Sequence, residues 1–289
     1  MVSESLQTVL GRLGFIPALG LLLVLWPAGF LDAAPPTLPR WEVGLGVGTV
    51  DFPVYRGSAE RRRLTLPLPY VIYRGERVRV DREGVRGLLG RLGASELIAS
   101  FGAALPVDSE DNDRRAGMPD LAPLLEFGPA LQIPVFEGQD ADLTVDLVLP
   151  ARAAISVDFN AIRYAGLTFD PEIQIRATNL LDDWDLYFSG GPEFANRRYH
   201  ERFYGVQPQF ARPDRQAYSA GAGYGGAGLA MSLQRRFGRL WVAMFMSYDN
   251  LAGARFVDSP LVETRHYLAG GFGVAWVFWE CEREADSCF

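Results

Sequence analysis

The chain has 289 residues, 48% of them hydrophobic and 22% charged, which is enough apolar material for a sizeable core and excludes wholesale disorder. The formal net charge of −7 and a pI near 5.0 argue against a general nucleic-acid-binding protein.

The N-terminal segment has the layout of an export signal. Residues 13–31, which follow Arg12, carry no charge, and small residues up to Ala34 precede a proline-rich stretch. This layout predicts a cleavable signal peptide over residues 1–34. The alternative is an uncleaved membrane anchor, which Pro17 and Pro27 make less favourable.

From Trp41 onward, large apolar residues alternate with small or polar ones. The pattern is clearest over residues 41–50, 97–105, 124–133, 142–150, 239–249 and 267–279. A period of two indicates β-strands, and segments of about 9–13 residues match tilted strands that cross a bilayer. We therefore predict an all-β fold: a closed antiparallel transmembrane β-barrel over residues 40–279, with about 12 strands (roughly 10 to 14).

The alternative all-β fold is a large soluble β-sandwich. The strand lengths argue against it, as does the alternation of long polar connections with tight turns such as "YRGER" and "RFGRL". We also expect both chain ends of the barrel in the periplasm and the protein in the outer membrane of a Gram-negative bacterium.

The last strand shows what each face of the barrel contacts. Phe272, Val274, Trp276 and Phe278 lie on one face, and the other face carries small residues such as those at 271, 273 and 275. We expect the large residues to contact lipid and the small ones to line the interior.

Charged residues on the small or polar faces are candidates for the barrel lumen. Glu126, Asp146 and Arg239 occupy such positions in their segments. An arginine in the lumen would bias a pore toward anions.

Paired arginines recur along the chain, at positions 61–63, 114–115, 197–198 and 235–236. In loops they can bind lipopolysaccharide phosphates, because a guanidinium contacts phosphate through two parallel hydrogen bonds. They can equally pair with neighbouring carboxylates, as in "EDNDRR", and both interpretations remain open.

The two cysteines, Cys281 and Cys288, lie in a C-terminal tail of residues 280–289. In an exported chain this spacing predicts a small disulfide loop, although the thiols can also stay reduced. A zinc site is disfavoured because the spacing and the histidine count do not fit one.

The sequence contains no catalytic signature. The two histidines are His200 and His266. A Ser–His–acid set could combine His266 with Ser247 or Ser259, but the sequence has no GxSxG pattern for the nucleophile. It has no HExxH metal motif either. The glycine-rich "GYGGAG" leads into an alternating strand rather than the helix that dinucleotide binding requires. We expect no enzymatic activity, no cofactor and no metal.

Several motifs resemble one family. These are "YRGS" at 55–58, "GMPDLAPLLEFGP" at 117–129, "YGV" at 204–206, "YDNLAGARFVDSPLV" at 248–262, and the glycine-aromatic strand at 272–278. Over residues 40–278, and most closely after Arg202, the chain resembles the MipA/OmpV family of MltA-interacting-protein-like outer-membrane proteins. It departs from the family pattern in its tail, so either Phe278 or Phe289 is the terminal aromatic read by the barrel-assembly machinery.

The resemblance implies two functions and no site residues. One is a non-enzymatic scaffold that links a lytic transglycosylase to a penicillin-binding protein in murein remodelling. The other is a porin-like channel for small solutes. The lipid and lipopolysaccharide of the outer membrane are the further partners we expect.

Overall fold

The computed structural model describes residues 39–75, 77–81, 84–138, 142–158, 161–180 and 183–281. The predicted signal peptide, Cys288 and Phe289 lie outside these residues. The first strands are β1 (Trp41–Pro53), β2 (Arg61–Arg74), β3 (Val78–Asp81), β4 (Gly84–Leu92), β5 (Ser95–Ala104), β6 (Leu124–Glu137) and β7 (Leu143–Asp158). The remaining strands are β8 (Ala161–Phe169), β9 (Glu172–Leu180), β10 (Trp184–Ala195), β11 (Gly223–Phe237), β12 (Leu240–Asn250) and β13 (His266–Cys281).

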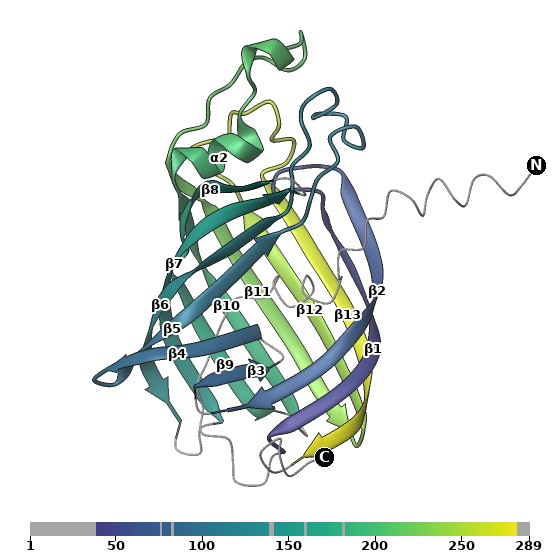
Figure 1. Cartoon of the computed structure of the whole chain (residues 1–289), viewed down its shortest axis with the longest axis vertical. Coiled ribbons are helices and arrows are strands. Elements are labelled where there is room, and N and C mark those ends of the chain that lie inside the picture. Colours follow the sequence, from purple (N-terminus) through teal and green to yellow (C-terminus); the bar gives the residue numbers. More distant parts are fainter. Residues whose placement is uncertain are drawn as a thin grey trace, which may run out of the picture.

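The strands form one closed antiparallel barrel (Figure 1). Apart from β8 and β9, each strand pairs with its neighbours in chain order, and β13 pairs with β1, so the sheet returns on itself. Strands β8 and β9 lie end to end between β7 and β10, separated by Asp170 and Pro171. Thirteen strands, two of which share one position, thus make a 12-strand barrel, which confirms the predicted fold class.

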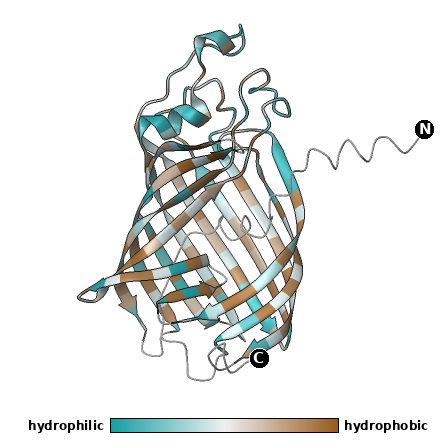
Figure 2. Cartoon of the chain, viewed as in Figure 1, coloured by the Kyte–Doolittle hydropathy of each residue, from teal (hydrophilic) through white to brown (hydrophobic). Residues whose placement is uncertain are grey.

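The period-two pattern separates the two faces of the wall as expected (Figure 2). On β1, Leu45 and Val47 are exposed on the outside, whereas Glu42 is 1% exposed in the interior. Barrels suit a membrane because pairing between neighbouring strands satisfies backbone amides that lipid cannot. Within the described part of the chain, no helix is long and apolar enough to cross a membrane.

The two ends of the barrel differ. Long connections, residues 54–60, 105–123, 196–222 and 251–265, gather at what we call the loop end, and short turns gather at the opposite turn end. The described chain begins and finishes at the turn end, where Trp41 pairs with Cys281.

Arg239 lies in one of these short turns and not on the lumen wall. Gly238 ends β11 with a positive φ of 60°, a conformation that a two-residue hairpin turn requires, and Arg239 completes the turn with an exposed side chain. The prediction of a lumen position for Arg239 is therefore wrong, because β12 begins at Leu240, one residue later than the alternation suggests.

Packed side chains fill the interior at the turn end. The carboxylate of Glu42 accepts hydrogen bonds from Arg74 at 2.6 Å, from Arg236 at 2.8 Å and from the Tyr70 hydroxyl at 2.9 Å. The ring of Trp241 packs 5.4 Å from that of Tyr70. A hydrogen-bonded polar cluster and a pair of aromatic rings thus lie inside the barrel beside β1, β2, β11 and β12.

Candidate functional site

The four long connections fold together into a domain-like cover, which we call the loop cap. Its core consists of buried apolar side chains from all four connections and from β13: Tyr55, Val107, Leu121, Tyr204, Ala220, Leu251, Ala254, Phe256 and Tyr267. Leu251 and Phe256 have no exposed surface, as in the centre of a soluble domain. The loop end is therefore closed by a hydrophobic core and is not a set of free loops.

A short helix, α2 (Arg197–Tyr204), forms one side of the loop cap. Asn196 caps its first turn by accepting a hydrogen bond from the Tyr199 amide at 3.0 Å. The ring of Tyr204 stacks on that of Phe256 with centroids 3.6 Å apart and planes 5° apart. The backbone carbonyl of Tyr204 accepts a 2.7 Å hydrogen bond from Ser259, which joins α2 to the connection between β12 and β13.

Buried arginines hold the backbone of the loop cap. Arg115 is 2% exposed and donates to Ser109 Oγ and to the carbonyls of Pro119 and Phe203. Burial lowers the pKa of Arg115 to about 10. Arg215 donates to three further carbonyls, so guanidinium groups satisfy acceptors that would otherwise be unpaired away from water.

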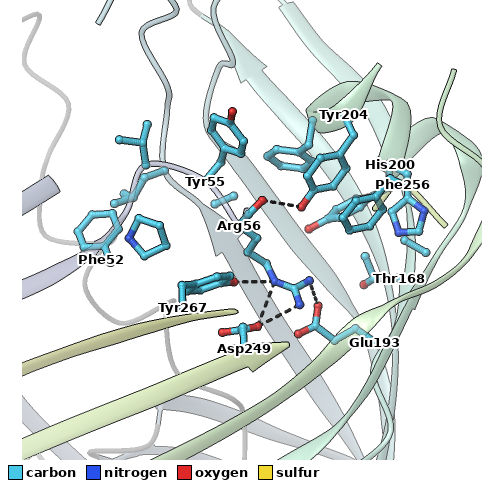
Figure 3. A pocket seen from close by; sticks show the side chains of 18 of the residues that line it. Phe52, Tyr55, Arg56, Thr168, Glu193, His200, Tyr204, Asp249, Phe256 and Tyr267 are labelled. Atoms are coloured by element: carbon cyan, nitrogen blue, oxygen red, sulfur yellow. Dashed lines mark hydrogen bonds and ion pairs between the residues drawn. The ribbon is translucent and has the colours of Figure 1, made fainter. Parts of the chain in front are cut away.

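Arg56 is the central residue of the site. It enters the barrel from the connection between β1 and β2, and Figure 3 shows its guanidinium surrounded by three strands. It pairs with Glu193 on β10, lies 3.0 Å from Asp249 Oδ1 on β12, and donates at 2.9 Å to the Tyr267 hydroxyl on β13. The Tyr204 hydroxyl donates to the backbone carbonyl of Arg56 at 3.0 Å. We call this set the Arg56 clamp, because one side chain ties the loop cap to three strands.

Two cavities adjoin the Arg56 clamp. The first, of about 300 Å³, lies beneath the loop cap and has an aromatic lining that includes Phe52, Tyr55, Phe203 and Phe256. The second, of about 380 Å³, continues into the barrel between β5, β6, β9 and β10.

The lining of these cavities is acidic. Its carboxylates are Glu126, Asp170, Glu172, Glu193 and Asp249, and its guanidiniums are Arg56 and Arg152. Arg152 lies 2.9 Å from Asp170 Oδ2, and the Tyr199 hydroxyl donates to Glu126 Oε1 at 2.8 Å. Carboxyl groups thus outnumber guanidiniums in the lining of these cavities.

Burial governs the protonation of the loop cap. It lowers the pKa of His200, whose Nδ1–H donates to the Gly221 carbonyl at 2.7 Å, so the ring is held neutral. Burial also raises the pKa of Tyr55 and of Tyr204, and both hydroxyls donate to backbone carbonyls. Among the described residues, no group of three or more His, Cys, Asp or Glu is arranged to hold a metal.

The remaining predicted site residues occupy distinct places. Glu126 is 8% exposed beside Arg152, and Asp146 is 6% exposed lower in the interior, opposite Gln174 on β9. Phe272, Trp276 and Phe278 are exposed by 62%, 54% and 55% on the outer face of β13, with Val274 half-buried beside them. Their contact with lipid stays a prediction, as does the Cys281–Cys288 disulfide, since Cys288 lies outside the described residues.

Sequence reasoning missed the Arg56 clamp and α2. Arg56 belongs to the "YRGS" motif, but nothing in the local pattern indicates which partners its side chain reaches. The sequence signal for α2 is Asn196 before "RRYHERFY", because asparagine is a common N-cap residue.

Comparisons with known proteins agree with the architecture. The family model described as "MltA-interacting protein MipA" matches residues 43–278. No curated protein sequence is similar enough to this chain to count as a match.

Two solved structures align with most of this chain at low similarity. The outer-membrane protease OmpT from Escherichia coli is 7% identical, with a TM-score of 0.31, over 86% of this chain and 99% of that one. A variant of the porin from Rh. blastica is 11% identical, with a TM-score of 0.15, over 82% of this chain and 99% of that one. At TM-scores this low, the two structures support no conclusion about the function of this chain. The match over nearly the whole barrel places the chain, an outer-membrane-type β-barrel, in the MipA family of MltA-interacting proteins.

Proposed function

We propose that the protein is a non-enzymatic adaptor that holds murein-remodelling enzymes, a lytic transglycosylase of the MltA type and a penicillin-binding protein, at the outer membrane. The observation that carries this proposal is the packing of side chains at both ends of the barrel: the loop cap covers one end, and the Glu42 cluster lies at the other. A barrel of this kind acts through its surfaces. The family's name, which specifies a partner and no reaction, supports the same function.

The turn end is the surface for these partners. Barrels of this type place long loops outside the cell and short turns in the periplasm, where murein lies. The turn between β4 and β5 projects from the wall (Figure 1), and Leu89 and Leu92 beside it are 59% and 64% exposed. Exposed apolar side chains on a projecting hairpin are suited to protein contact.

Affinity capture tests the adaptor function. The full protein in mild detergent is immobilised and mixed with a purified lytic transglycosylase of the MltA type, and the bound enzyme is quantified. We expect retention by the native chain and at least a tenfold loss with Leu89→Ser/Leu92→Ser. The matched control, Leu45→Ser on the outer face of β1, should leave retention unchanged. No retention by a correctly folded native chain contradicts the proposal.

Lipopolysaccharide is the membrane partner that we propose for the loop end. A groove of about 800 Å³ runs between α2, β8 and the connection from β5, and it contains Arg115, Arg163, Arg197, Arg198 and Arg202 against Asp120, Asp158 and Glu201. Arg198 lies over the Tyr164 ring at 5.5 Å, and Arg163 and Arg198 are exposed. This excess of arginines suits phosphate groups.

The groove is tested with Arg163→Ala/Arg198→Ala and with Arg91→Ala, an exposed arginine at the turn end. We expect the double variant to bind lipopolysaccharide several-fold more weakly, and the control to bind normally. Equal binding of intact and dephosphorylated lipopolysaccharide by the native chain would contradict phosphate recognition.

The alternative function, a porin-like channel, predicts stable conductance steps from purified protein in a planar bilayer. The side chains packed at both ends of the barrel favour the absence of measurable conductance. If current does pass, the acidic cavities predict cation preference, which reverses the anion bias expected from a lumen Arg239.

A further inference from the structure

In the part of the chain that the structure describes, strand pairing is interrupted in the barrel wall between β2 and β5. Strand β3 pairs with β2 only at Tyr73 and Arg74, and β4 pairs with β5 only as far as Ala99. Among the described residues, β2 from Arg61 to Ile72 and β5 from Ser100 to Ala104 therefore have no strand neighbour on the facing sides. Figure 1 shows these two ribbons diverging toward the turn end, with β3 confined to the lower wall.

Hydrogen bonds at the end of β2 show how its backbone is oriented. The Arg74 amide donates to the Arg40 carbonyl on the β1 side at 2.9 Å, and the Gly75 amide donates to the Val78 carbonyl on the β3 side at 3.1 Å. Because successive residues of a strand point their amides to opposite edges, odd-numbered residues of β2 face the opening. Pro67 and Pro69 are both odd-numbered, so both of their nitrogens lie on this free edge.

These two prolines make the free edge compatible with a membrane. An unpaired amide N–H in lipid costs several kcal/mol, whereas proline has no N–H to leave unpaired. Proline at a free edge also blocks pairing with another strand. At Pro67 and Pro69 the edge therefore has carbonyl acceptors and no amide donor, which disfavours pairing there with an extended β3 or with a second copy of the chain.

The opening lies beside the two cavities of the site. Ala103, Ala104 and Leu105 from the free end of β5 line the first cavity together with Phe52 and Val54, and residues 101–103 line the second. Half-buried leucines at 64, 66 and 68 border the opening on the β2 side. An apolar group in the membrane thus has a short path to the acidic interior.

We propose that this opening is a lateral entry for an amphipathic amine, a molecule with one apolar chain and a protonated amino group. The apolar chain lies between β2 and β5, and the amino group lies among the carboxylates, with Asp170 and Glu193 common to both cavities. A protonated amine is a donor-only group, and it matches both the excess of carboxylates and the acceptor-only edge at Pro67 and Pro69. An anionic amphiphile of the same length lacks both complementarities. This binding is independent of the adaptor function.

The test uses a photoreactive dodecylamine and the matching photoreactive dodecanoate on the full protein in phosphatidylcholine nanodiscs. We expect the amine to label residues 64–69 and 101–105, and the carboxylate to label them about tenfold less, the ratio given by about 1.4 kcal/mol of charge complementarity. Equal labelling by both probes, or amine labelling confined to the general lipid belt around Phe272 and Trp276, would overturn the proposal.

Two variants sharpen the test. Asp170→Asn removes one carboxylate, and we expect it to lower labelling by the amine roughly threefold to tenfold without changing labelling by the carboxylate. Ala103→Trp narrows the opening, and it should abolish labelling at residues 64–69. Val47→Ala, on the outer face of β1, serves as the control. Heat-modifiable gel mobility establishes that each variant is folded. Unchanged amine labelling in folded Asp170→Asn and Ala103→Trp proteins would also overturn the proposal.

Discussion

Removal of the Arg56 guanidinium tests whether the loop cap is held to the barrel by the Arg56 clamp. Arg56→Met keeps most of the aliphatic stem and deletes the charge, so packing changes little. The substitution leaves Glu193 and Asp249 facing each other with no cation between them.

The expected cost follows from the burial of the clamp. Loss of one partner from a buried ion pair costs about 3–5 kcal/mol. The side chains of Arg56, Glu193 and Asp249 are 30%, 33% and 14% exposed to solvent. Solvent screening therefore reduces the cost of losing the ion pair. We expect a loss of about 2–3 kcal/mol in the free energy of unfolding, which corresponds to roughly 30- to 150-fold in the equilibrium constant.

Urea unfolding in lipid vesicles, followed by tryptophan fluorescence, measures this loss. The control is Arg61→Ala, which breaks an ion pair with Asp51 at an exposed site and should cost less than about 1 kcal/mol. Adding Glu193→Gln and Asp249→Asn to Arg56→Met should recover at least half of the loss, since the uncompensated charges are gone. An Arg56→Met protein no less stable than Arg61→Ala, or no recovery in the triple variant, would refute the reasoning.

Three further predictions concern the loop cap and the tail. Phe256→Ala removes the stacked partner of Tyr204 from a fully buried position and should cost about 3–5 kcal/mol, seen as protease cleavage in residues 251–265 of an otherwise folded barrel. Because the pKa of His200 is lowered in the folded state, the unfolded state binds more protons, so loop-cap stability should be full above about pH 6.5 and fall with acidification. Hydrogen exchange between pH 7 and pH 5 measures this fall, and His200→Gln should abolish it. Intact-mass analysis after alkylation should show Cys281 and Cys288 modified only after reduction, and modification without reductant would exclude the disulfide.

The barrel was predictable because side chains alternate between the two faces along most of each strand, and the sequence shows that alternation directly. Register shifts interrupt it at a few points, such as the one between Ala154 and Ile155 on β7. Strand ends were less predictable, as Arg239 demonstrates, because a single glycine conformation decides where a strand stops. The Arg56 clamp could not be predicted, since its partners lie on strands far along the chain and no local period connects them.

The long reach of Arg56 has a consequence for the order of folding. Its three partners stand 137, 193 and 211 positions away in the chain, among the last strands to be synthesised. Contacts of such high sequence separation form late, because a long stretch of chain must be placed before they are gained. The guanidinium can therefore reach its carboxylates only after β10, β12 and β13 have joined the sheet that β1 begins. Formation of the Arg56 clamp is therefore expected to be a late step of barrel assembly. In a protein whose barrel has not yet closed, the loop cap is not held to the strands and is more accessible to proteases and chaperones.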